Sequence, residues 1–87
     1  MDLEGKVAVV TGGARRVGRA IALALAERGG ELVLHYRESE RAAQEVLAQA
    51  RRHGGKPVAV RADLARREEA GRVIAAAVEA FGRVDIL

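Results

Sequence analysis

The feature that most constrains the fold is the junction between residues 6–10, KVAVV, and residues 11–19, TGGARRVGR. The first segment is a β-branched run, typical of a short strand buried on both faces. The second is rich in glycine and leads into apolar residues at helical spacing: Val17, Ile21, Ala24 and Leu25. A strand, a glycine-rich turn and a helix start form the context in which proteins hold dinucleotide phosphates. The junction therefore predicts the first βα unit of a nucleotide-binding sheet.

The rest of the chain alternates between strand-like and helix-like segments. Residues 31–36, ELVLHY, and 57–62, PVAVRA, predict two further strands. Apolar residues at helical spacing predict helices over 17–28, 39–53 and 66–81, each followed by glycine. This alternation predicts an α/β fold with a doubly wound parallel sheet, a Rossmann fold.

The last residues, 83–87, RVDIL, predict the opening of a fourth strand. The expected architecture is thus βαβαβαβ with strand order 3-2-1-4. A fourth strand this short would leave an apolar edge unpaired, which proteins usually avoid. We therefore expect residues 1–87 to be the N-terminal part of a single Rossmann domain.

Composition excludes several classes of protein. The chain has 87 residues, 49% of them hydrophobic and 31% charged, which is ordinary for a globular protein. It has no cysteine, so a disulfide framework and a thiolate metal site are excluded, and we expect no metal. It also has no run of about 18 apolar residues and no apolar N-terminal targeting core, so a cytoplasmic location is the default expectation.

The charge pattern argues against nucleic-acid and membrane partners. The net charge is only +3, and arginines alternate with glutamates in segments such as ESERAAQEV and ARREEAGR. Such interleaving is typical of solvated helix faces. Aromatic residues for base stacking are also scarce, at 2% of the chain. The expected partners are small molecules.

The glycine-rich segment has the residues that a phosphate-binding turn needs. Gly12 allows a tight turn, and Gly18 lets the following helix approach the sheet. Unpaired N–H groups near Val17, at the helix start, direct positive charge towards an anion.

The segment TGGARRVGRAIA resembles the TGxxxGxG loop of the short-chain dehydrogenases/reductases, single-domain Rossmann oxidoreductases that use NAD or NADP. The resemblance extends over all 87 residues, through RADL at 61–64 and GRVDIL at 82–87. With Arg16 in place of the middle glycine and LHYRES at 34–39, the chain looks most like the pteridine reductase or 3-oxoacyl-carrier-protein reductase branch. The resemblance implies reduction of a carbonyl or pterin-like substrate by hydride transfer, in a complete protein that is a homo-oligomer.

Arg16 has two interpretations. A guanidinium at this position can pair with the cofactor pyrophosphate or with a substrate stacked on the nicotinamide. Alternatively, Arg16 is a solvated side chain at a position that does not need glycine geometry.

The end of the second predicted strand indicates which nicotinamide cofactor is held. An NAD site carries a carboxylate there, whereas this chain has His35-Tyr36-Arg37, followed by Glu38. Cationic and hydroxyl groups suit the 2′-phosphate of NADP. By resemblance, the 2′-phosphate group comprises Arg15, His35, Tyr36, Arg37 and Ser39, and the adenine contacts are Asp63 and Leu64.

Simpler interpretations stay open for two of these residues. A single histidine at a strand end, such as His35, is often a hydrogen-bonded structural residue. Asp63 can instead cap the turn into the next helix.

No catalytic residue is expected within the chain. The family donates a proton from a tyrosine followed four residues later by a lysine, and Tyr36, the only tyrosine, lacks that lysine. The chain is thus either the cofactor-binding part of a reductase or a non-catalytic dinucleotide-binding module.

Overall fold

The computed structural model describes residues 3–12 and 16–85. Strands and helices alternate along the chain, as the sequence predicted, in the order β1 (Val7–Val10), α1 (Arg16–Glu27), β2 (Glu31–Tyr36), α2 (Glu40–Arg51), β3 (Val58–Arg61) and α3 (Arg67–Phe81). The longest helix has 15 residues. In this described part of the chain, no helix is both long and apolar enough to cross a membrane.

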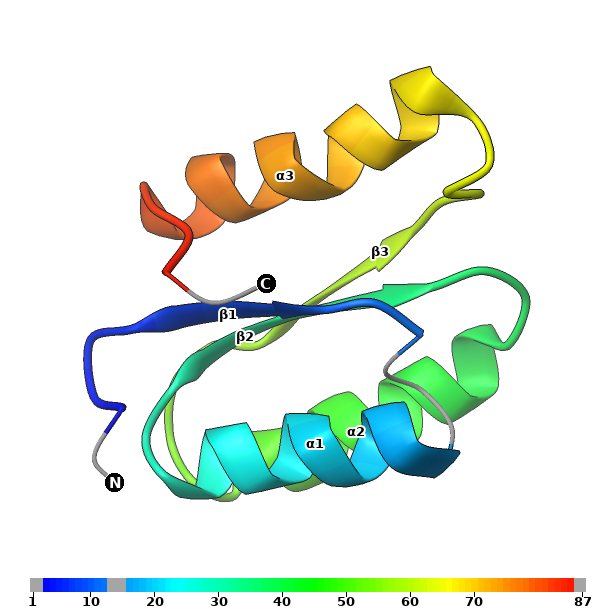
Figure 1. The fold of residues 1–87 in the computed structure, drawn as a ribbon. Helices are drawn as coiled ribbons and strands as arrows, with labels where there is room; N and C mark the ends of the chain where they lie inside the picture. The colour runs from blue at the N-terminus through cyan, green and yellow to red at the C-terminus, as the bar shows by residue number, and fades with distance from the viewer. Residues whose placement is uncertain (1–2, 13–15, 86–87) are drawn as a thin grey trace.

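The three strands form one parallel sheet with β2 in the centre. β1 pairs with β2, Val10 lying opposite Leu34, and β2 pairs with β3, His35 lying opposite Val60. Helices α1 and α2 cover one face of the sheet, and α3 covers the other (Figure 1). The predicted doubly wound parallel sheet, with strand order 3-2-1, is confirmed.

Both faces of the sheet are buried, because side chains alternate between the two faces along each strand. The buried residues on the α1 and α2 side are Val10, Leu32 and Leu34 of the sheet with Ala22, Ala26, Ala43, Val46, Leu47 and Ala50 of the helices. Those on the α3 side are Val7, Val9, Val33, Val60 and Ala62 with Val73 and Ala77.

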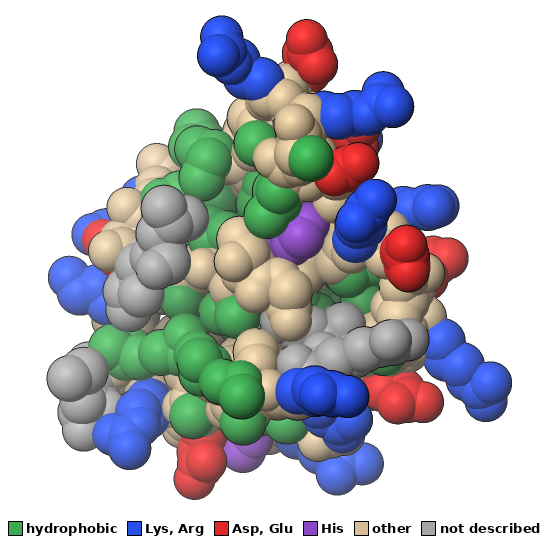
Figure 2. Space-filling model, turned by 45° about the vertical axis from the view of Figure 1, so that its right-hand side comes forward, with side chains coloured by type: hydrophobic (Ala, Val, Ile, Leu, Met, Phe, Trp, Pro, Cys, Tyr) green, Lys and Arg blue, Asp and Glu red, His purple; other side chains and the backbone are tan. Residues whose placement is uncertain are grey.

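Most of the apolar face predicted for α1 was wrong, because Ala24 is exposed and, of the predicted residues, only Leu25 packs against the core. Val17 and Ile21 are 72% and 48% exposed, whereas Ala22 and Ala26 are buried. Small alanine side chains let the helix approach the sheet closely, so they take the inward positions. In α3, Ile74 is also 40% exposed. Hydrophobic side chains are open to solvent over much of the face in Figure 2, with charged side chains at its edge.

The predicted ends of two helices are confirmed. Ser39 is the N-cap of α2, where its Oγ accepts a hydrogen bond from the Ala42 N–H at 3.3 Å. Gly82 ends α3 in the left-handed conformation, with φ +79°, and its N–H donates to the Val78 carbonyl at 2.7 Å.

Residues 83–85 form no strand, and only Asp85 of them has hydrogen bonds to the backbone of β1. The Asp85 N–H donates to the Val7 carbonyl at 2.9 Å, and Asp85 Oδ2 accepts from the Val7 N–H at 2.9 Å. This is the edge of β1 that faces away from β2, where the predicted fourth strand would pair. The other two residues of that predicted strand, 86 and 87, lie outside the described residues.

Candidate nucleotide-binding site

The candidate site lies at the carboxyl ends of the three strands. Three turns begin there: Thr11-Gly12 after β1, Arg37-Glu38 after β2 and Ala62-Asp63 after β3. In open parallel sheets, ligands bind outside the carboxyl ends of the strands. The predicted phosphate, ribose and adenine contacts therefore come from neighbouring turns on one edge.

The glycine turn begins after β1, and its described residues are Thr11, Gly12 and those that open α1. Gly12 has φ +61°, in the region that favours glycine. Gly18 is half-buried in the first turn of α1, and Val17 beside it is exposed. The predicted 2′-phosphate contact Arg15 lies outside the described residues.

Arg16 opens α1 with φ +50°, the only described non-glycine residue with a positive φ. A side chain in this left-handed region costs about 1 kcal/mol, which glycine avoids. The idea that Arg16 occupies a position without glycine geometry therefore does not hold. Its side chain is exposed at the start of the helix, where an anion would be bound.

His35, near the end of β2, has hydrogen-bond partners for both ring nitrogens. Nδ1 accepts from the Gly12 N–H at 3.0 Å, and Nε2 lies 2.7 Å from the Ala62 carbonyl oxygen. The residue is only 5% exposed. These contacts favour the structural interpretation of His35 over a direct contact with the 2′-phosphate.

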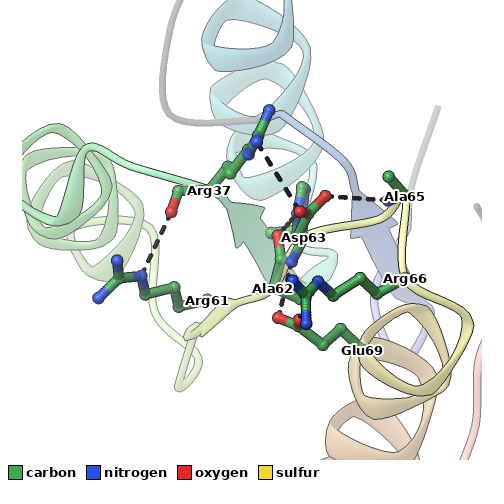
Figure 3. Close-up of polar contacts among 8 residues, drawn as sticks. Arg37, Arg61, Ala62, Asp63, Ala65, Arg66 and Glu69 are labelled. Atoms are coloured by element: carbon green, nitrogen blue, oxygen red, sulfur yellow. Dashed lines mark hydrogen bonds and ion pairs between the residues drawn. The ribbon is translucent and has the colours of Figure 1, made fainter.

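An open hollow lies beside these turns, and Figure 3 shows the side chains of Arg37, Arg61, Asp63, Arg66 and Glu69 from its lining. Its volume of about 310 Å³ is at the lower end of the range of about 300–1,000 Å³ typical of small-molecule sites. Six charged residues line it: Arg37, Glu38, Arg61, Asp63, Arg66 and Glu69.

Arg37 and Arg61 adjoin one another at the hollow. Arg61 Nε donates to the Arg37 carbonyl at 3.3 Å, which brings two guanidinium groups to the ends of β2 and β3. The Arg37 side chain is 65% exposed, and its Nη2 lies 3.8 Å from Asp63 Oδ2. An ion pair this exposed is worth about 0–1 kcal/mol, so Arg37 can leave it for a stronger anion at little cost.

Asp63 is held in the turn between β3 and α3. Its Oδ1 accepts from the Ala65 N–H at 3.0 Å, and its own N–H donates to Glu69 Oε1 at 3.0 Å (Figure 3). The N-cap of α3 is Arg66, so Asp63 stabilises the turn but does not cap the helix. Its remaining oxygen, Oδ2, faces Arg37.

The other predicted contacts occupy varied surroundings. Leu64 is 41% exposed beside Asp63. Tyr36 is half-buried against the core between the sheet and helices α1 and α2. The hydroxyl of Ser39 accepts a hydrogen bond as the α2 cap, which leaves its hydrogen free to be donated.

Sequence reasoning missed Arg61, Arg66 and Glu69 at this site. Arg61 ends β3, and Arg66 and Glu69 form an i,i+3 pair with Nε and Oε2 3.8 Å apart. All three lie within the elements predicted over 57–62 and 66–81. Their places at the end of a strand and in the first turn of a helix were the available signal, but we assigned the charges of residues 65–72 to a solvated face. Within the described ranges, no group of three or more potential metal ligands occurs.

Comparison with known proteins decides the family. The model of the short chain dehydrogenase family matches residues 6–87, nearly the whole chain. The chain belongs to this family.

Two of the curated proteins that the chain resembles have the word reductase in their names. It is 44% identical over 86 residues to a hydroxynaphthalene reductase-like protein of Metarhizium anisopliae, covering 99% of this chain and 32% of that protein. It is 42% identical over 85 residues to versicolorin reductase 1 of Aspergillus parasiticus, covering 98% and 32%. The chain thus spans about a third of the length of these relatives.

Solved structures of the family match the fold closely. A dehydrogenase/reductase from Sinorhizobium meliloti is 42% identical with a TM-score of 0.92, over 97% of this chain and 33% of that one. A short chain dehydrogenase from Burkholderia cenocepacia, solved in complex with NADP, is 38% identical with a TM-score of 0.93, over 98% and 35%.

Proposed function

We propose that residues 1–87 are the N-terminal cofactor-binding part of an NADPH-dependent oxidoreductase, which reduces a carbonyl or pterin-like substrate by hydride transfer. The observation that carries the NADP assignment is Arg37. It stands at the carboxyl end of β2, is 65% exposed at the hollow and has one carboxylate contact, at 3.8 Å. The family membership of the chain supports the nicotinamide chemistry.

Energetics favour a phosphate over Asp63 as the partner of Arg37. A charge-assisted hydrogen bond contributes about 1.5–3 kcal/mol, and the exposed ion pair that it replaces contributes about 0–1 kcal/mol. Arg61, whose Nε donates to the Arg37 carbonyl, adds a second guanidinium to the lining of the hollow. The first residues after β2 include no aspartate to accept the ribose hydroxyls of NAD, and Glu38 comes one position after Arg37.

The other assigned residues surround the same ligand. Tyr36 and Ser39 complete the 2′-phosphate group with Arg15, and Asp63 and Leu64 contact the adenine. The glycine turn and the start of α1 hold the pyrophosphate through Gly12, Arg16, Val17 and Gly18. His35 is left out of the phosphate group, because both of its ring nitrogens have protein partners.

The chemistry belongs to the part of the protein beyond residue 87. The cofactor supplies the hydride, and this chain binds and orients the cofactor. The relatives named as reductases of hydroxynaphthalene and versicolorin support the reductive direction. Apolar residues on α1 and α3 are exposed, as expected if further elements of the complete protein cover them. We keep a cytoplasmic location and a homo-oligomeric complete protein as parts of this proposal.

Cofactor binding in the complete protein tests the proposal. Dissociation constants for NADPH and NADH are measured by the fluorescence of the reduced nicotinamide, and oxidation of NADPH is followed with carbonyl and pterin substrates. We expect tighter binding of NADPH and substrate-dependent oxidation. Equal affinity for the two cofactors would refute the NADP assignment. Tight binding without turnover on any substrate would favour a non-catalytic binding module.

A further inference from the structure

We propose that His35 is a positioning residue that fixes Thr11-Gly12, the turn after β1, relative to Ala62-Asp63, the turn after β3, with the ring proton on Nε2 and a lone pair on Nδ1. The inference rests on the proposed function, because it assumes that these two turns hold the two ends of one dinucleotide. It assigns His35 a role through its neighbours and not through contact with the cofactor.

The position of His35 in the sheet makes this bridge possible. β2 is the central strand, so its last residues have the end of β1 on one side and the end of β3 on the other. His35 follows Leu34, which pairs with Val10, and it lies opposite Val60. One imidazole therefore reaches Gly12, two residues beyond β1, and Ala62, one residue beyond β3.

The two partners determine the protonation state of the ring. The Gly12 N–H can only donate, so Nδ1 must carry a lone pair, and the Ala62 carbonyl can only accept, so Nε2 must carry the proton. The distances are 3.0 Å and 2.7 Å, and the residue is 5% exposed. Protonation of Nδ1 would remove the acceptor for Gly12.

The contact with His35 also determines the role of Gly12 in the turn after β1. Its N–H points inward to His35 and is not a donor for phosphate. Gly12 thus serves through its backbone shape, with φ +61°, and His35 holds the peptide unit that sets this shape. On the other side, the Ala62 carbonyl precedes Asp63, whose Oδ2 faces Arg37.

Two substitutions in the complete protein separate the two contacts. In His35→Asn, the side-chain oxygen can replace Nδ1 as acceptor for Gly12, but the side chain is too short to reach Ala62. In His35→Gln, the amide nitrogen can replace Nε2 as donor to Ala62, but the acceptor for Gly12 is lost. His53→Gln is the matched control, because His53 is exposed after α2 at the opposite edge of the sheet.

The probes are NADPH and adenosine 2′-monophosphate, which lacks the pyrophosphate. We expect His35→Gln to raise the dissociation constant of NADPH roughly three- to tenfold, the value of one hydrogen bond, and to leave that of the monophosphate unchanged. We expect His35→Asn to raise both constants by a similar factor. His53→Gln should change neither.

Two results would show a purely structural role of His35 and overturn the proposal. One is an equal change in the dissociation constants of both probes in His35→Gln. The other is that neither variant changes either dissociation constant, although its melting temperature is lower. If the variants fail to fold, ¹⁵N NMR of the unsubstituted protein decides. At neutral pH, the His35 ring must be protonated on Nε2 alone, and a proton on Nδ1 would overturn the geometry. Failure of the unsubstituted protein to bind either nicotinamide cofactor would instead refute the proposed function, together with the cofactor-positioning role inferred here.

Discussion

Replacing Arg37 with aspartate in the complete protein should weaken NADPH binding and spare NADH. The loss of a charge-assisted hydrogen bond removes about 1.5–3 kcal/mol. The unsubstituted protein gives up about 0–1 kcal/mol when Arg37 leaves Asp63, since those side chains are 65% and 29% exposed. The net loss is therefore about 0.5–3 kcal/mol, a roughly two- to 150-fold rise in the dissociation constant of NADPH.

The new carboxylate adds repulsion towards the 2′-phosphate. Two unit charges about 6 Å apart interact by about 0.7–2.8 kcal/mol for effective dielectric constants between about 80 and 20. NADH has no 2′-phosphate, and its ribose hydroxyls can donate to the carboxylate, so its dissociation constant should stay constant or fall. The ratio of the two constants should thus move towards NADH by at least about tenfold.

The assay is titration of reduced-nicotinamide fluorescence with each cofactor. Arg37→Ala separates the lost contact from the added repulsion and should give the roughly two- to 150-fold effect of the lost contact alone. Arg28→Asp is the charge-matched control, because exposed Arg28 lies between α1 and β2 at the opposite edge of the sheet. An unchanged ratio in Arg37→Asp would refute the 2′-phosphate role of Arg37.

Arg16→Gly should weaken cofactor binding by about 1–3 kcal/mol if the guanidinium contacts the pyrophosphate, even though glycine relieves about 1 kcal/mol of backbone strain at φ +50°. If Arg16 instead contacts substrate, the KM for substrate should rise more than the KM for NADPH, and no change in either would make Arg16 a solvated residue. The Arg83 guanidinium and the Val7 N–H lower the pKa of the Asp85 carboxyl group in the folded protein. The carboxylate therefore contributes fully to the free energy of unfolding above its ordinary pKa of 3.8, and this contribution is lost as the pH falls through its lower pKa in the folded protein. Melting curves recorded below pH 3.8 should therefore show an acid-dependent loss that Asp85→Asn abolishes, and an identical pH dependence in both proteins would contradict the assignment. Residues 1–87 expressed alone should show no reductase activity, because the tyrosine and lysine expected to donate the proton are not among them, and measurable NADPH oxidation would contradict the proposed division of roles.

The sequence by itself determined the order of the elements and the class of the fold. Short β-branched runs alternate with helices of 12 to 15 residues that end near glycines, and these local signals act over a few residues. The Ser39 cap and the Gly82 stop were predictable for the same reason. The glycine segment between 11 and 19 also located the connection from β1 to α1, which is the turn proposed to bind phosphate.

Which side chains come into contact at the ends of neighbouring strands followed from the tertiary structure alone. Sequence patterns left open whether His35 binds phosphate or supports the turns, and the pairing of β2 with both neighbours brought Gly12 and Ala62 to its two ring nitrogens. The pairing of β2 with β3 likewise brought Arg61 to Arg37, 24 residues apart in the chain. Such contacts depend on the strand register and on how closely the alanine face of α1 approaches the sheet. No local sequence pattern specifies either property, because both arise only when distant segments pack together.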